Sequence, residues 1–305
     1  YMLRITNFTK KYGNKTAVNN LSIHIKKGEI FGFIGHNGAG KTTTLKMILN
    51  LVSPDEGTVV FDGKDVTHNN LFLLKNTGVL LEGSRNMYWA LSPMENFVYW
   101  GGQRGLSKKE AEKRGETLLK QFGLLDKKYT SITRLSRGMQ QVVGICCAMI
   151  AEPKLLILDE PTLGLDLNAT QIMIKSLNML SANGVGILVT THQMEFAQEI
   201  ANKILLINHG KLVFSNSIKD SLEKLNKQEI FEVHLTQELT ASEKEDILAS
   251  CELTKKTDGV YRLGVKPQAS LSQVLKLLSE LPISSIQTVT RGLDEIFKYY
   301  TEKEK

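Results

Sequence analysis

The sequence predicts an α/β domain over its first two thirds and a small α+β domain after it. Apolar, strand-like segments alternate with helix-like segments up to about residue 216, which is typical of α/β layering. A glycine-rich loop follows one of these strands, and glycine becomes rare after Ser217. Because the chain has 305 residues, two domains of ordinary size are expected. We place them at residues 1–216 and 217–305.

Six segments of the first domain have the composition of strands: 3–8, 28–34, 57–61, 154–158, 185–191 and 204–208. The tetrapeptide Asn208-His209-Gly210-Lys211 predicts a hairpin turn that leads into a further strand at 212–214. Ser92 with Glu95, and Ser107 with Glu110, form capping boxes that mark two helix starts. Gly123 is a suitable stop for the second of these helices.

The second domain repeats neither the spacing nor the glycine content of the first. Strands are expected at 230–235, 253–256, 260–265 and 285–289, and helices at 241–249, 271–281 and 293–301. Asp258-Gly259 predicts a hairpin between the second and third strands. The order β-α-β-β-α-β is that of a ferredoxin-like fold.

Composition and charge exclude several classes of protein. The net charge is +6, but no run reaches five like charges, so a nucleic-acid-binding tail is not indicated. No apolar stretch approaches the length of a transmembrane helix; the longest, 142–151, reads as a buried helix. The three cysteines, Cys146, Cys147 and Cys251, lack metal-ligand spacing, which favours a reducing cytosol.

One loop matches the phosphate-binding pattern G-x-x-x-x-G-K-[ST] and stands between a strand and a helix, as that pattern requires. It comprises Gly35, His36, Asn37, Gly38, Ala39, Gly40, Lys41 and Thr42, and Thr43 continues it into the helix. Glycines let backbone N–H groups turn toward phosphate oxygens, and the helix N-terminus adds positive potential. Lys41 is expected to reach the β- and γ-phosphates, and the Thr42 hydroxyl to bind Mg²⁺.

A second chemical site follows the apolar strand at 154–158. The strand ends in Asp159-Glu160, and ligands of open α/β sheets sit at the carboxyl ends of such strands. Asp159 is placed to bind Mg²⁺, and Glu160 to polarise a water for in-line attack on the γ-phosphate. Taken alone, the two acids could equally be a solvated turn; the phosphate loop favours the catalytic interpretation.

The segment Leu135-Ser136-Arg137-Gly138-Met139-Gln140 lies upstream of this strand at the distance of an ABC signature motif. Together with the phosphate loop and Asp159-Glu160, it makes residues 3 to about 216 resemble an ATP-binding cassette (ABC) ATPase. The resemblance implies a P-loop NTPase fold with a parallel core sheet, an antiparallel β subdomain and a helical subdomain. ATP and Mg²⁺ are the implied cofactors.

Further residues take roles from this resemblance. Tyr12 would stack on adenine, and Glu82 stands where the family has its Q-loop glutamine, near Mg²⁺ or the attacking water. Asp166 resembles the D-loop aspartate, and His192 the switch histidine that contacts the γ-phosphate. Taken singly, Tyr12 could be a half-buried surface aromatic, Asp166 a turn residue and His192 a capping residue.

The signature segment departs from the family pattern at two positions. Arg137 replaces the commoner glycine and Met139 replaces a glutamine, whereas Ser136 and Gly138 are retained. In the family these two face the γ-phosphate bound by a partner subunit. The departures, Glu82 and the additional domain resemble ATPase subunits of drug- and antibiotic-resistance exporters. The segment 292–297 (GLDEIF) resembles the end of that subgroup's C-terminal extension.

The resemblance also implies partners. One cassette per chain requires a second ATPase subunit, in a homodimer or heterodimer with ATP between the two. A separate transmembrane permease would hold the protein at the cytoplasmic face of the membrane, and no nucleic acid is expected. The aromatic segment 83–100 could be core or the groove for that permease.

Two other functions were weighed against a transporter subunit. A soluble ABC ATPase with a regulatory or nucleic-acid-handling role is disfavoured, because the chain has one cassette and no sustained heptads between loop and signature. A GTPase is disfavoured because the chain lacks an Asn-Lys-x-Asp motif.

Overall fold

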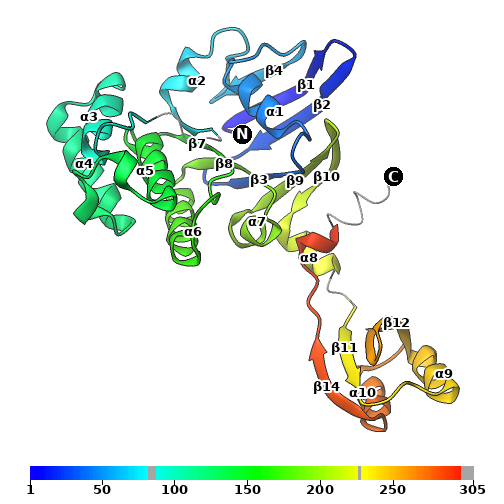
Figure 1. Ribbon diagram of the computed structural model, residues 1–305. Helices are drawn as coiled ribbons and strands as arrows, with labels where there is room; N and C mark the ends of the chain where they lie inside the picture. The colour runs from blue at the N-terminus through cyan, green and yellow to red at the C-terminus, as the bar shows by residue number, and fades with distance from the viewer. Residues whose placement is uncertain (82–86, 226–227, 297–305) are drawn as a thin grey trace. The chain divides into compact units, whose positions relative to one another are not determined.

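The computed structural model describes residues 1–81, 87–225 and 228–296 (Figure 1). Within these residues the chain forms two compact units, Tyr1–Ile218 and Lys219–Ile296. The first unit holds two sheets and most of the helices, and the second holds one sheet and its own helices.

A six-stranded sheet with the order β10-β9-β3-β8-β7-β6 forms the centre of the first unit. Its strands are β3 (Ile30–Ile34), β6 (Thr77–Leu80), β7 (Leu155–Asp159), β8 (Gly186–Thr191), β9 (Lys203–Asn208) and β10 (Lys211–Ser217). All neighbours pair in parallel except β10, which runs antiparallel to β9. Every residue of β3, β7 and β8 is buried, as parallel strands covered on both faces should be.

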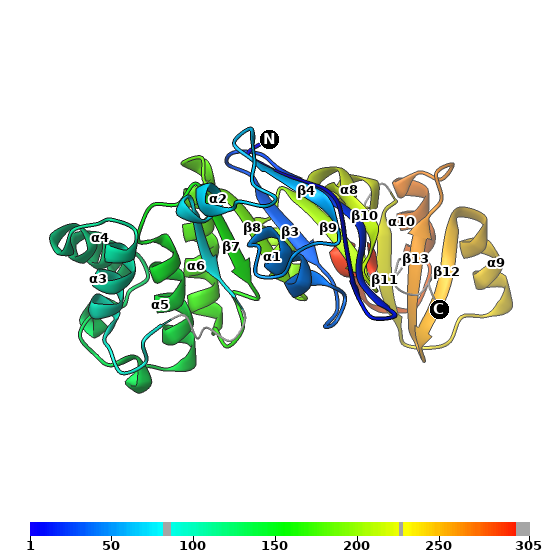
Figure 2. The same ribbon diagram turned by 90° about the horizontal axis from the view of Figure 1, so that it is seen from above.

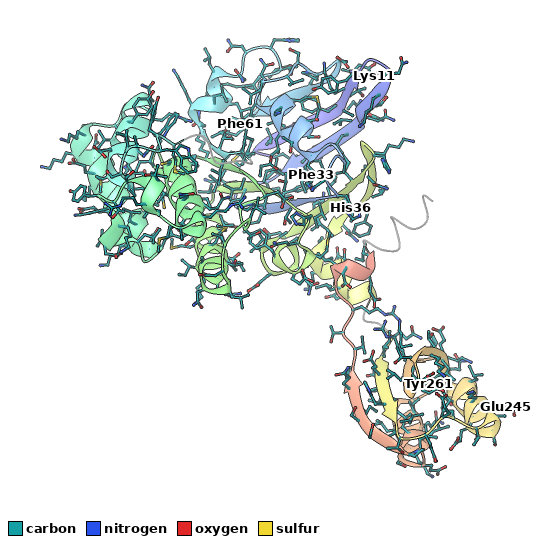
Figure 3. All side chains as sticks on the ribbon, in the orientation of Figure 1. Lys11, Phe33, His36, Phe61, Glu245 and Tyr261 are labelled. Carbon is teal, nitrogen blue, oxygen red and sulfur yellow. The ribbon has the colours of Figure 1, made fainter. Side chains whose placement is uncertain are left out.

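An antiparallel sheet with the order β2-β1-β4-β5 packs over one face of this parallel sheet. Its strands are β1 (Leu3–Tyr12), β2 (Lys15–Ile25), β4 (Glu56–Phe61) and β5 (Lys64–Asp65). Phe61 of this sheet and Phe33 of the parallel sheet share one core cluster and are fully buried (Figure 3). Helix α1 (Lys41–Ile48) contributes Leu45 and Ile48 to the same core.

Helix α2 (Leu71–Lys75) packs into the core shared by the two sheets through Leu73. The other helices of the first unit lie at one end of the parallel sheet and across its other face (Figure 1). They are α3 (Pro93–Gln103), α4 (Lys108–Gln121), α5 (Arg137–Met149), α6 (Leu167–Ala182) and α7 (Met194–Ile200), with single 3₁₀ turns at Leu125–Lys127 and Ile132–Arg134. Both predicted capping boxes are confirmed at the starts of α3 and α4. Gly123 has φ 67° after α4, and the N–H groups of Gly123 and Leu124 donate to carbonyls of the last turn. The parallel core, antiparallel subdomain and helical subdomain confirm the predicted fold class.

The second unit has the connectivity of a ferredoxin-like fold. After α8 (Ile218–Leu225) follow β11 (Ile230–Leu235), α9 (Ala241–Ser250), β12 (Cys251–Thr257), β13 (Val260–Val265), α10 (Leu271–Ser279) and β14 (Ile283–Thr288). The strands form one antiparallel sheet in the order β12-β13-β11-β14, seen from above in Figure 2. Tyr261, labelled in Figure 3, is buried with Val233 and Val274 in a core of its own.

Several element boundaries differ from the sequence prediction. β2 and β6 were not predicted: Asn20 interrupts the alternation of β2 with φ 50°, and β6 has only four residues. β14 begins two residues before the predicted strand. The predicted helix at 293–301 is described only over residues 293–296, and its remainder lies outside the described residues.

The three cysteines are free thiols, and burial in α5 raises the pKa of Cys146 well above its ordinary value. Such a thiol is a packing residue rather than a nucleophile. Among the helices of the described ranges, none combines the length and apolar character needed to cross a bilayer.

The contact between α3 and α4 supplies a test of the packing. A Cβ added at Gly115 of α4 would overlap the buried Phe97 ring of α3, whereas a Cβ at Gly102 of α3 meets nothing within 4 Å. We expect Gly115→Ala to lower the free energy of unfolding by about 1–3 kcal/mol through overpacking. Gly102→Ala should instead raise it by about 0.5–1 kcal/mol, because alanine favours the helix. Urea denaturation of both variants measures the difference; equal effects would contradict the described packing.

Candidate functional site

The candidate site lies where three neighbouring parallel strands end. β3, β8 and β7 are adjacent in the sheet, so their carboxyl ends reach the same edge. The chain leaves β3 through the loop at 35–40, leaves β7 at Glu160 and leaves β8 at His192. Strand order therefore brings the loop at 35–40 together with two segments that follow it by more than a hundred residues in the sequence.

The loop at 35–40 turns tightly around glycines that tolerate no side chain. Gly40 has φ 110°, and a Cβ there would lie 2.5 Å from the Ala17 carbonyl oxygen. Gly38 has φ 80° and open space around it. Gly40 is the N-cap of α1 and offers no side-chain cap, so the first N–H groups of the helix remain available to an anion.

Lys41 is the buried cation of the site. Its side chain is 6% exposed, and Nζ lies 2.5 Å from the Gly35 carbonyl oxygen and 3.3 Å from Glu160 Oε1. A buried ammonium needs such oxygen partners, because burial without them strongly disfavours the charge. The same position lets Nζ meet phosphate oxygens that enter the loop.

Asp159 is joined to helix α1 and to the neighbouring strand β8. The Thr42 hydroxyl donates to Asp159 Oδ2 at 3.2 Å, and the Thr190 hydroxyl of β8 donates to Oδ1. A carboxylate beside a hydroxyl is a hard-oxygen donor set, which suits Mg²⁺ bound with phosphate oxygens and water. The residues present thus fit the ion, although no group of three acidic, His or Cys side chains forms a metal cage within the described ranges.

Glu160 lies between the cation and the histidine. Its Oε2 is 2.9 Å from His192 Nδ1, and its Oε1 is buried near Lys41 without a hydrogen bond of proper geometry. Glu160 also has φ 50°, a left-handed conformation that costs free energy in a non-glycine residue. Its N–H donates to the Thr190 carbonyl at 3.1 Å, which helps to hold this conformation.

A pocket of about 710 Å³ opens over the loop. Its lining residues are Tyr12, Lys15, Thr16, Ala17, His36, Asn37, Gly38, Gly40, Lys41, Thr42, Thr43, Asp159, Glu160, His209 and Gly210. Tyr12 is 51% exposed at this pocket, and Lys10 Nζ lies 5.5 Å from its ring centre. An exposed aromatic ring can stack on a planar ligand. His36, labelled in Figure 3, also lines the pocket.

Sequence reasoning missed several residues of this site. Thr190 lies in an otherwise apolar strand, and its position near the carboxyl end was the only sign that it belongs to the site. His209 was predicted only as part of a hairpin turn, yet it lines the pocket with φ 44°. The turn that carries it is fixed to the loop by the Gly210 N–H, which donates to the Ala39 carbonyl at 2.9 Å.

The signature segment does not line this pocket. Ser136 is the N-cap of α5, where its Oγ accepts from the Met139 N–H, and Arg137 packs against Gly164. Gly138 also lies beside Gly164, because a Cβ added at Gly138 would be 3.2 Å from the Gly164 carbonyl oxygen. The Gln140 side chain donates to two carbonyls before the helix.

The other predicted site residues take separate positions. Asp166 is the N-cap of α6, and its Oδ1 accepts from the Ala169 N–H at 2.8 Å. His192 contacts the site through Glu160, and 47% of its side chain is exposed. The next residue, Gln193, accepts from the Thr162 hydroxyl at 2.9 Å, which links the segments after β7 and β8. Glu82 lies outside the described residues.

Comparison with known proteins agrees with this geometry. The family described as ABC transporter matches residues 18–163. The ABC transporter ATP-binding protein NatA of Bacillus subtilis is 32% identical over 75% of this chain and 95% of its own length. The linearmycin resistance ATP-binding protein LnrL of the same organism is 32% identical over 76% of this chain and 74% of its own.

Two further comparisons extend the match. An uncharacterised ABC transporter ATP-binding protein of B. subtilis, YcbN, is 34% identical over 97% of this chain and 96% of its own. A bacterial ABC transporter cassette whose structure is described as dimeric superposes with a TM-score of 0.65 at 26% identity, over 71% of this chain and 99% of that one.

The phosphate loop, the paired acids and the similarity over most of the chain lead to one conclusion. The chain belongs to the ABC transporter ATP-binding proteins, a family that binds and hydrolyses ATP.

Proposed function

We propose that this chain is the ATP-hydrolysing subunit of an exporter, and that it acts as a dimer on a separate membrane permease. The observation that carries the proposal is the convergence of Lys41 and His192 on the Glu160 carboxylate, within 3.3 Å. The name of the LnrL relative refers to linearmycin resistance, which supports an exported substrate.

ATP would enter the pocket over the loop with its phosphates at the N-terminus of α1. The N–H groups at the start of α1 and the Lys41 ammonium would supply donors for the β- and γ-phosphates. Tyr12 would stack on the adenine at the far wall. Thr42 and Asp159 would hold Mg²⁺, which neutralises phosphate charge when bound.

Hydrolysis needs a base beside the attacking water. Glu160 would accept the proton as the water oxygen bonds to the γ-phosphorus and the bond to the ADP oxygen breaks. His192, bonded to the same carboxylate, would orient it and reach the γ-phosphate. The products are ADP and inorganic phosphate.

The position of the signature segment supports a dimer. Ser136 and Arg137 are exposed and none of the signature residues lines the pocket of their own chain. A second copy arranged head to tail would place these groups over the first copy's γ-phosphate. The dimeric structure of a similar cassette agrees with this arrangement.

An aromatic surface on α3 and the preceding turn is the proposed permease contact. Tyr88 is 46% exposed, and Trp89 and Tyr99 are each 39% exposed, whereas Phe97 of the same segment is fully buried. Tyr88 and Tyr99 hydrogen bond through their hydroxyls at 2.9 Å, and the Trp100 ring stands edge-on to Tyr99. Such amphipathic aromatics are typical anchors of protein interfaces.

Substitution of Lys41 tests nucleotide binding. Lys41→Ala should raise the Kd for ATP by about 10- to 100-fold, because a charge-assisted hydrogen bond is lost. Lys46→Ala removes an exposed lysine from the same helix and should leave the Kd unchanged. Titration calorimetry with ATP measures both values, and equal affinities would count against the loop assignment.

Substitution of Glu160 separates binding from turnover. Glu160→Gln should bind ATP with wild-type affinity and lower kcat by about 10²–10⁴-fold, since the amide cannot accept the proton. Glu56→Gln, an exposed position on β4, is the matched control. Phosphate release under saturating ATP is the measurement. Turnover retained in Glu160→Gln would remove the proposed base.

Co-expression with a membrane protein encoded beside this chain tests the permease contact. The wild-type chain should co-purify with it from detergent, and Tyr99→Asp should release it by placing a charge in the aromatic surface. ATP binding by the variant should be unchanged. A native partner that proves soluble would contradict the transport proposal.

A further inference from the structure

The second unit carries an unprotected sheet edge at β14. All six residues of the strand, Ile283–Thr288, are uncharged, and five of them are exposed. Its sequence, ISSIQT, contains no lysine or proline, the residues that usually block strand addition. Pro282 stands before the strand, and the one register shift lies at its first residues.

The other edge of the same sheet has the opposite character. β12 carries Glu252, Lys255 and Lys256, and Lys255 forms ion pairs with Glu238 and Asp258. Charges of this kind keep an edge from pairing with another chain. Of the two edges of this sheet, β14 is therefore the one to which a strand of another chain can be added.

The register shows which backbone groups of β14 face outward. The Val289 N–H donates to the Ile230 carbonyl, so even-numbered residues of β11 direct their backbone toward β14. Their partners there are Ser285, opposite His234, and Gln287, opposite Glu232. Because main-chain groups alternate along a regularly paired strand, those of Ile286 and Thr288 point away from the sheet, whereas Ser284 lies at the register shift.

We propose that two copies of this chain pair antiparallel through β14, joining their second units into one continuous eight-stranded sheet. A register centred on Ile286 sets its outward main-chain groups against those of the partner's Ile286. No charged residue meets another in this register, so the strand is complementary to itself.

Apolar packing favours the same register. Ile286 is paired with Val233, whose side chain is in the core of the second unit, yet Ile286 itself is 44% exposed. Cross-strand pairs of β-branched residues stabilise a sheet. Pairing would cover Ile286 with its symmetry mate and extend this core across the two-fold axis.

This dimer would form without nucleotide, which separates it from the ATP-bridged dimer proposed above. Sedimentation of the full chain without ATP should show a concentration-dependent monomer–dimer equilibrium, also in Lys41→Ala. Ile286→Lys sets like charges opposite each other and should raise the dimer Kd by about tenfold or more. Thr257→Lys, at an exposed position of β12, adds the same charge to the protected edge and should leave the Kd unchanged.

Cysteine cross-linking gives a second readout that does not depend on a destabilising charge. Ile286→Cys should oxidise to a disulfide-linked dimer, because paired residues have Cα atoms about 5.5 Å apart, within disulfide reach. Thr257→Cys should stay monomeric under the same oxidation. A wild-type chain that is monomeric at all concentrations, an unchanged Kd in Ile286→Lys, or equal cross-linking by both cysteines would overturn the proposal. The proposed ATP binding and hydrolysis do not depend on this pairing, so none of these results would contradict them.

Discussion

The candidate site depends on the parallel pairing of β3, β8 and β7. Parallel strands end at one edge, so the phosphate loop, the paired acids and His192 meet there although the sequence separates them widely. The pairing also fixes Thr190 opposite Asp159. The Thr190 hydroxyl therefore donates to Asp159, and the Thr190 carbonyl accepts from the Glu160 N–H. Burial of all residues in these strands keeps their ends fixed relative to one another.

Local chemistry made much of the fold predictable. Ser92 and Ser107 begin helices because each is followed by a glutamate that closes a capping box. The β-α-β-β-α-β order of the second unit was readable from its alternation and the turn at Asp258-Gly259. β2 and β6 could not be read in this way, since an asparagine with positive φ broke the pattern of one and four residues are too few for the other.

The site was predictable where spacing along the chain encodes it. The loop at 35–42 is contiguous, and Asp159-Glu160 follows an obvious apolar strand. Thr190 and His209 depend instead on strand order and on a hairpin bond to Ala39, which no local pattern reveals. The roles of Tyr12, Asp166 and the signature residues rest on resemblance and stay predictions. Their positions at a pocket wall and at two helix caps are compatible with those roles.

The left-handed backbone of Glu160 bears on how this chain can change in evolution. At φ 50° glycine or asparagine would be less strained than glutamate, so the residue that best fits the backbone is not the residue that the proposed proton acceptor requires. A copy of the chain no longer selected for ATP turnover could therefore gain stability at this position while it loses activity. In such a copy we expect substitutions at this position that stabilise the fold and abolish ATP hydrolysis, rather than substitutions that unfold the protein.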